Sequence, residues 1–134
     1  MPHHRTIVHV VGARPNFMKL APVHAALRAR GVRQSVVHTG QHYDAVMSDA
    51  ILKELGLPEP DVNLGVGSGS HATQTAQVMV AMEEHLGSAT PDLLLVYGDV
   101  NSTMAATLAA AKLHIPVALL KPGCARSIAE CRKR

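Results

Sequence analysis

Short apolar runs alternate with helix-like segments along nearly the whole chain, and this alternation constrains the fold more than any other feature. The apolar runs predict buried strands over residues 6–12, 34–40, 92–99 and 116–120. Periodic segments with turn residues at their ends predict helices over 16–31, 45–55, 73–86 and 102–115. The segment 56–72 is rich in Gly, Pro and Ser and is predicted to be a loop, with GVGSGS as a flexible linker.

The strands carry few polar positions, which is typical of strands buried on both faces of a parallel sheet. Strands and helices in this order predict a doubly wound, Rossmann-like α/β layer, and 134 residues are enough for one such domain. On the 73–86 helix we expect Ala76, Met79, Val80 and Leu86 to share the buried side. Ligands of doubly wound sheets bind outside the carboxyl ends of the strands, so functional residues are expected there.

The charge of the chain is unevenly distributed and argues against a nucleic-acid partner. The formal net charge is +3, but residues 1–120 hold eight Lys/Arg and nine Asp/Glu, and the last fourteen residues hold five and one. The body therefore lacks the basic surface that nucleic acid requires. Cys124 and Cys131 both lie in the basic tail, and the nine histidines are scattered along the chain, so no metal is expected. The absence of a long apolar stretch or a signal-peptide pattern favours a cytoplasmic protein without a membrane partner.

The turn after the first strand carries two cations. Gly12 permits a tight backbone path, and Pro15 suits the first turn of a helix, whose free N–H groups attract anions. Arg14 and Lys19 would add positive charge there, which favours a phosphate or diphosphate ligand, although two solvated surface cations remain an alternative. No G-x-G-x-x-G follows the strand, so the dinucleotide fingerprint is absent.

Two further strand ends carry candidate residues. Gln41 and His42 in HTGQH could line a sugar pocket or form only a polar turn. Asp99 in YGDVNST follows the most apolar strand and could handle a proton or a sugar hydroxyl, or merely cap the next helix.

Together, GARPNFMKLAPV, HTGQHYD, YGDVNST and AAAKLHIPVA resemble the non-hydrolysing UDP-N-acetylglucosamine 2-epimerases over residues 5–118. The resemblance implies the N-terminal half of a glycosyltransferase-B-type fold and a homodimer that interconverts UDP-N-acetylglucosamine and UDP-N-acetylmannosamine. The family eliminates UDP to form a glycal and adds it back on the other face, with no cofactor. It also implies that Arg14 and Lys19 contact the UDP diphosphate and that Asp99 lies near the C2 proton.

The chain departs from the family pattern after residue 118. The family continues HVEAGLRS, whereas this chain reads LLKPGCARS and places Lys121 where a glutamate is expected. With suitable codons, loss of one base from a family-like gene reproduces all residues from 119 to 134. We therefore expect residues 1–118 to be part of the UDP-sugar domain, 119–134 to be an aberrant tail, and the second domain to be absent.

The sequence thus predicts an incomplete UDP-N-acetylglucosamine 2-epimerase serving polysaccharide biosynthesis, with this chain alone inactive. The alternatives are the nucleotide-sugar half of a glycosyltransferase and a non-catalytic fragment.

Overall fold

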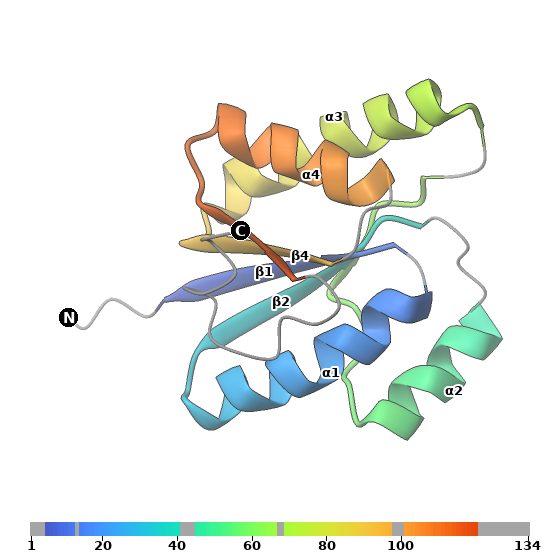
Figure 1. Ribbon diagram of the computed structural model, residues 1–134, viewed down its shortest axis with the longest axis vertical. Coiled ribbons are helices and arrows are strands. Elements are labelled where there is room, and N and C mark those ends of the chain that lie inside the picture. Colours follow the sequence, from blue (N-terminus) through green and yellow to red (C-terminus); the bar gives the residue numbers. More distant parts are fainter. Residues whose placement is uncertain (1–4, 13, 41–44, 67–68, 98–100, 121–134) are drawn as a thin grey trace.

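The computed structural model describes residues 5–12, 14–40, 45–66, 69–97 and 101–120. Five strands and four helices occupy this part of the chain (Figure 1): β1 Thr6–Val11, α1 Arg14–Ala29, β2 Arg33–His38, α2 Ala45–Leu55, β3 Val62–Asn63, α3 His71–Ala89, β4 Leu93–Tyr97, α4 Asn101–Lys112 and β5 Val117–Leu120. Within this part of the chain, no helix has the length and apolar character needed to span a membrane.

The strands form one parallel sheet in the order β3-β2-β1-β4-β5. The chain builds outward from β1 through β2 to β3, then returns to the other side of β1 to add β4 and β5. This confirms the doubly wound α/β prediction and places the topological switch point between β1 and β4. One prediction was wrong: the segment 56–72 contains the short strand β3, which pairs with the end of β2 at Val37↔Val62.

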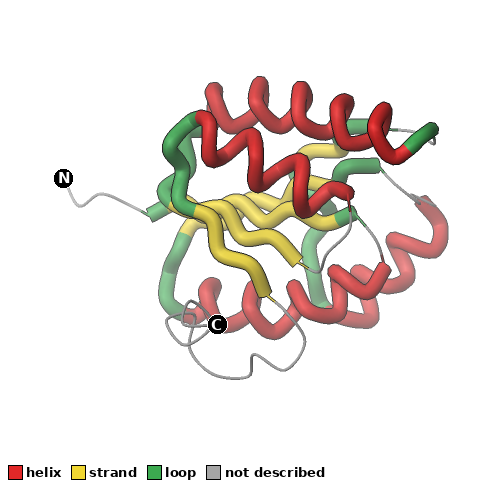
Figure 2. Tube along the Cα trace, turned by 45° about the horizontal axis from the view of Figure 1, so that its top comes forward, coloured by secondary structure: helices red, strands yellow, loops and turns green. Residues whose placement is uncertain are grey.

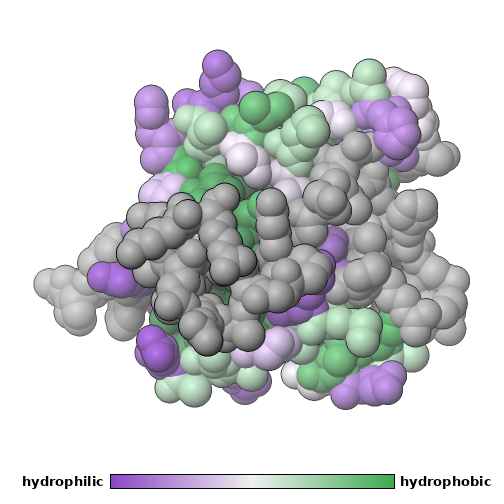
Figure 3. All heavy atoms as spheres, viewed as in Figure 1, coloured by the Kyte–Doolittle hydropathy of each residue, from purple (hydrophilic) through white to green (hydrophobic). Residues whose placement is uncertain are grey.

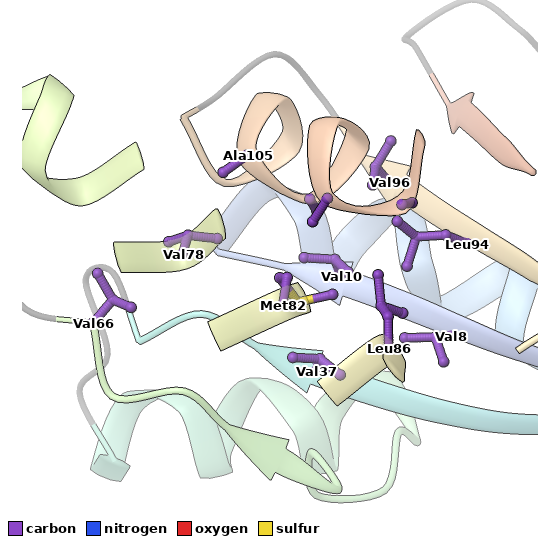
Figure 4. Close-up of a cluster of buried hydrophobic side chains, with 13 residues drawn as sticks. Val8, Val10, Val37, Val66, Val78, Met82, Leu86, Leu94, Val96 and Ala105 are labelled. Atoms are coloured by element: carbon purple, nitrogen blue, oxygen red, sulfur yellow. The ribbon is translucent and has the colours of Figure 1, made fainter. Parts of the chain in front are cut away.

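Helices cover both faces of the sheet. α1 and α2 lie on one face and α3 and α4 on the other (Figure 1), with the strands as a single layer between them (Figure 2). Alternate residues of β1 face the two layers: Val8 and Val10 pack with α3 and α4, whereas Ile7 and Val11 pack with α1 and α2. Figure 4 shows the first of these cores. Burial on both faces explains why the strands lack polar alternation.

The buried side of α3 agrees with the predicted one at Leu86, and Met79 is half-buried against the core, but it differs at Ala76 and Val80. Val78, Met82 and Leu86 are fully buried and point toward the sheet (Figure 4), whereas Ala76 is exposed and Val80 is 67% exposed. The buried residues follow an i, i+4, i+8 spacing along one stripe. The prediction failed because α3 carries apolar residues on more than one side, and periodicity alone does not select among them.

Apolar side chains also reach the surface of the α3–α4 layer. The large exposed ones on these two helices are Val80, Met104 at 60% and Leu108 at 43%. Figure 3 shows apolar atoms on the surface of the helical layer at the top of the view.

Helix ends follow local sequence signals. Gly31 follows α1 with a φ of +72°, and its N–H donates to the Arg28 carbonyl, so RARG ends this helix as predicted. Ser70 caps α3 by accepting a hydrogen bond from the Thr73 N–H at 3.2 Å. The end of the predicted linker is therefore a helix cap, and Val66 within it is buried in the core.

Candidate functional site

The carboxyl ends of β1 and β4 lie side by side at the switch point of the sheet. Val10 of β1 pairs with Val96 of β4. Beyond this pair the chain continues from β1 to α1 and from β4 to α4. Arg14 is the first residue of α1, so this helix begins two residues earlier than predicted and directly at the sheet edge. Lys19 lies on the same helix and is half-buried. A helix start and a nearby lysine at a switch point form a suitable environment for an anionic ligand.

The remaining predicted site residues lie outside the part of the chain that the structure describes. These are Gln41, His42 and Asp99. Of Arg14, the structure describes the backbone but not the side chain. The described residues nearest to Asp99 in the sequence are Tyr97, the last residue of β4, and Asn101, the first residue of α4.

Asn16 links the carboxyl ends of β1 and β4. Its side chain is only 3% exposed and lies between the sequence positions of Arg14 and Lys19. The Gly12 N–H donates to Asn16 Oδ1 at 3.0 Å, and Asn16 Nδ2 donates to the Tyr97 carbonyl at 3.2 Å. Sequence reasoning missed Asn16, although a polar residue among the apolar positions of a helix start was a usable signal.

The turn after β2 is held by a buried histidine. The Gly40 N–H donates to His38 Nδ1 at 2.8 Å, and the His38 ring stacks on Phe17 of α1 with 5.5 Å between ring centroids. His38 is 2% exposed, and burial lowers its pKa to about 4, so the ring is neutral at pH 7. The ring therefore organises the backbone immediately before Gln41 rather than carrying charge to a ligand.

A second buried histidine, His9 of β1, is hydrogen-bonded to side chains of both neighbouring strands. His9 Nδ1 lies 2.8 Å from Tyr97 Oη, His9 Nε2 lies 2.7 Å from Gln34 Oε1, and Gln34 Nε2 donates to the His24 carbonyl at 3.0 Å. Since Gln34 Oε1 can only accept, His9 Nε2 carries the proton and Nδ1 accepts from the tyrosine hydroxyl.

Burial fixes the charge states of this network. It lowers the pKa of His9 to about 4, with positive charge on His24 adding to the effect and the Gln34 bond opposing it. It also raises the pKa of Tyr97 and lowers that of His24. His9 and Tyr97 are therefore neutral at pH 7, and they connect β1, β2 and β4 without presenting a proton to the strand-end turns.

Two observations concern other ligand sites. A groove of about 540 Å³ lies beside α3, lined by Leu64, Val66, Val80 and Glu84 among others, and none of the described residues that line it is a predicted site residue. Among the residues that the structure describes, no cluster of three or more His, Cys, Asp or Glu side chains could hold a metal ion.

A doubly wound sheet with a built polar turn at its switch point defines a class of α/β proteins that bind ligands at the carboxyl edge of the sheet. The family model for UDP-N-acetylglucosamine 2-epimerase matches residues 25–128, which is most of the chain. The chain therefore belongs to the UDP-N-acetylglucosamine 2-epimerase family, a family of isomerases, as its motifs predicted.

Known relatives agree with this assignment. A UDP-N-acetylglucosamine 2-epimerase homolog of Methanococcus maripaludis is 50% identical over 87% of this chain and 32% of its own length. The UDP-2,3-diacetamido-2,3-dideoxy-D-glucuronate 2-epimerase of Pseudomonas aeruginosa is 41% identical over 87% of this chain and 33% of its own.

A solved structure agrees as well. The UDP-GlcNAc 2-epimerase of Methanocaldococcus jannaschii, solved in complex with UDP-GlcNAc and UDP, superposes with a TM-score of 0.82 at 37% identity. The match covers 86% of this chain and 32% of that one. The chain thus spans about a third of the length of these relatives.

Proposed function

We propose that this chain carries part of the UDP-sugar site of a non-hydrolysing UDP-N-acetylglucosamine 2-epimerase. The observation that carries the proposal is the adjacency of β1 and β4 at the switch point, with Asn16 bonded to both strand ends. From this adjacency we infer that Arg14 and Asp99, which follow β1 and β4 in the sequence, act on the same ligand. An enzyme that eliminates UDP from a UDP-sugar requires cations beside the leaving diphosphate and a carboxylate beside the C2 proton.

The proposed reaction assigns a role to each predicted residue. A base removes the C2 proton of UDP-N-acetylglucosamine, the C1–O bond breaks, and UDP leaves with the bonding electrons to give a glycal. UDP then adds back while a proton is delivered to the opposite face of C2, which gives UDP-N-acetylmannosamine. Arg14 and Lys19 stabilise the leaving diphosphate, and Asp99 is one of the carboxylates around C2. Gln41 and His42 line the sugar pocket.

The proposal also covers the location, oligomeric state and biosynthetic role of the enzyme. We propose a cytoplasmic homodimer that needs no cofactor and supplies a nucleotide sugar for polysaccharide synthesis. Exposed apolar side chains on α3 and α4 support self-association, because such side chains gain from being covered.

We further propose that residues 1–118 belong to the UDP-sugar domain and that 119–134 arise from a single-base slip. Leu119 and Leu120 complete β5, where they pair with Val96 and Tyr97. Lys121 and the rest of the tail lie outside the described residues. Because the 134-residue chain spans only about a third of the length of its relatives, we expect it to show no turnover by itself. The nucleotide sequence after codon 118 tests the slip, which is wrong if no single-base change restores a family-like frame.

The test of the function is an assay of the gene with this frame restored. We expect the product to convert UDP-N-acetylglucosamine into UDP-N-acetylmannosamine and, in D₂O, to place one deuterium at C2, since that proton is removed in the mechanism. Asp99→Asn should lower turnover by orders of magnitude. The comparison substrate is UDP-2,3-diacetamido-2,3-dideoxy-D-glucuronate, the sugar nucleotide in the name of the Pseudomonas relative. Transfer of the sugar to an acceptor, or no reaction with either nucleotide, would contradict the proposal.

A further inference from the structure

Asn16 occupies a position where a polar side chain needs a specific reason. It lies in the first turn of α1, where asparagine is not a favoured helix former, and its amide is almost completely removed from water. An amide in such surroundings is tolerated only when its oxygen and nitrogen are both hydrogen-bonded. The Gly12 N–H and the Tyr97 carbonyl supply these partners.

The bond to Tyr97 begins where the ladder between β1 and β4 ends. The last paired residues are Val10 and Val96, and the next residue of β4 is Tyr97, whose carbonyl faces the Asn16 amide. The same carbonyl accepts a bond from Thr103 Oγ1 of α4 at 2.9 Å. One oxygen therefore connects the starts of α1 and α4, which lie more than eighty residues apart in the sequence.

The neighbouring residue fixes the other side of α1. Phe17 is 3% exposed and stacks on His38 at the end of β2. The first turn of α1 is thus attached to β4 through Asn16 and to β2 through Phe17. The two residues that follow Arg14 and Pro15 therefore hold this turn relative to both neighbouring strand ends.

We propose that Asn16 is a positioning residue of the UDP-sugar site, one that fixes the first turn of α1 relative to the end of β4 and the start of α4. This inference rests on the proposed function, which assigns ligand contacts to Arg14, Lys19 and Asp99. Only an amide fits the role: aspartate could accept from Gly12 but could not donate to the Tyr97 carbonyl, and leucine could do neither.

The test uses the 134-residue chain and UDP, followed by ¹H–¹⁵N NMR. Asn16→Ala should weaken UDP binding about tenfold, as expected for losing one well-placed hydrogen bond. It should also shift the amide signals of residues 101–103, because Thr103 and Asn16 bond to the same Tyr97 carbonyl. Leu86→Ala is the control, because it opens a cavity far along α3 and costs at least as much stability. Leu86→Ala should leave UDP affinity and the 101–103 signals unchanged.

Each outcome decides the inference. UDP affinity of Asn16→Ala within twofold of the wild type, or an equal loss in Leu86→Ala, would overturn it. If the wild-type chain binds no UDP, binding by this chain is refuted, and the inference is then judged by the 101–103 signals alone. If Asn16→Ala does not fold, Thr103→Val replaces it. That variant should shift the side-chain amide signals of Asn16, and unchanged signals would refute the link between the starts of α1 and α4.

Discussion

Two histidines buried in neutral form should make this protein lose stability in mild acid. His9 is 0% exposed and His38 is 2% exposed, and burial lowers the pKa of each from 6.5 to about 4. Between these two pH values the unfolded chain binds protons that the folded chain does not. The stabilisation is therefore fully present above pH 6.5, decreases as the pH falls, and is lost once the pH passes through about 4.

The magnitude follows from these pKa values. Going from pH 7.5 to pH 5 should lower the free energy of unfolding by about 2 kcal/mol for each histidine, and by about 4 kcal/mol for both. Most small domains have only about 5–15 kcal/mol in total, so the loss should be easy to measure. Burial also lowers the pKa of His24, which acts in the same direction.

The assay is urea unfolding followed by circular dichroism at pH 7.5, 6 and 5. His9→Gln removes one titrating ring and should reduce the pH dependence by about 2 kcal/mol. Leu86→Ala lowers stability without touching a histidine and should keep the full dependence. An unfolding free energy constant to within about 0.5 kcal/mol between pH 7.5 and 5, or an unchanged dependence in His9→Gln, would refute the reasoning.

Three further substitutions test local features by the same unfolding measurement at pH 7.5. Gly40→Ala should cost roughly 2 kcal/mol or more, because Gly40 has a φ of +96° and an added Cβ would lie 2.7 Å from the Val66 backbone nitrogen; a neutral result would contradict this geometry. Tyr97→Phe should cost about 1–3 kcal/mol, because His9 Nδ1 loses its buried partner, and no loss would show that the bond contributes nothing. Thr90→Gly should stabilise by roughly 1 kcal/mol, because Thr90 ends α3 with a φ of +42°, and a destabilised variant would show that the threonine side chain matters more than its backbone strain.

Local sequence signals predicted the elements that form mainly through their own residues. Four of the strands were recognisable from apolar runs such as TIVHVV, and α2 from its periodicity. β3 was not, because it has two residues and exists through pairing with the end of β2. The buried side of α3 was missed for a similar reason, since Val78 and Val80 differ only in which one meets the sheet.

The site was predictable at the level of motifs but not of its supporting contacts. Arg14 and Asp99 are predicted site residues because they follow strands of a doubly wound sheet, where ligands bind, and this assignment stays a prediction. The roles of Asn16 and His9 depend on partners 81 and 88 residues away, Tyr97 in both cases. Such contacts follow from strand order, and a local pattern does not contain strand order.

The central claim is that the first turn of α1 binds the diphosphate of a UDP-sugar, and an NMR titration of the 134-residue chain with UDP tests it most directly. Because the 134-residue chain spans only about a third of the length of its relatives, we expect it to bind UDP weakly, with saturable shifts in the first turn of α1 and a Kd of about 1 mM, or about −4 kcal/mol. Arg14→Ala and Lys19→Ala should each abolish these shifts, whereas Lys53→Ala, which removes a cation from the last turn of α2, should not. A folded chain that shows no shifts at about 10 mM UDP, or equal shifts in Arg14→Ala, would contradict the account.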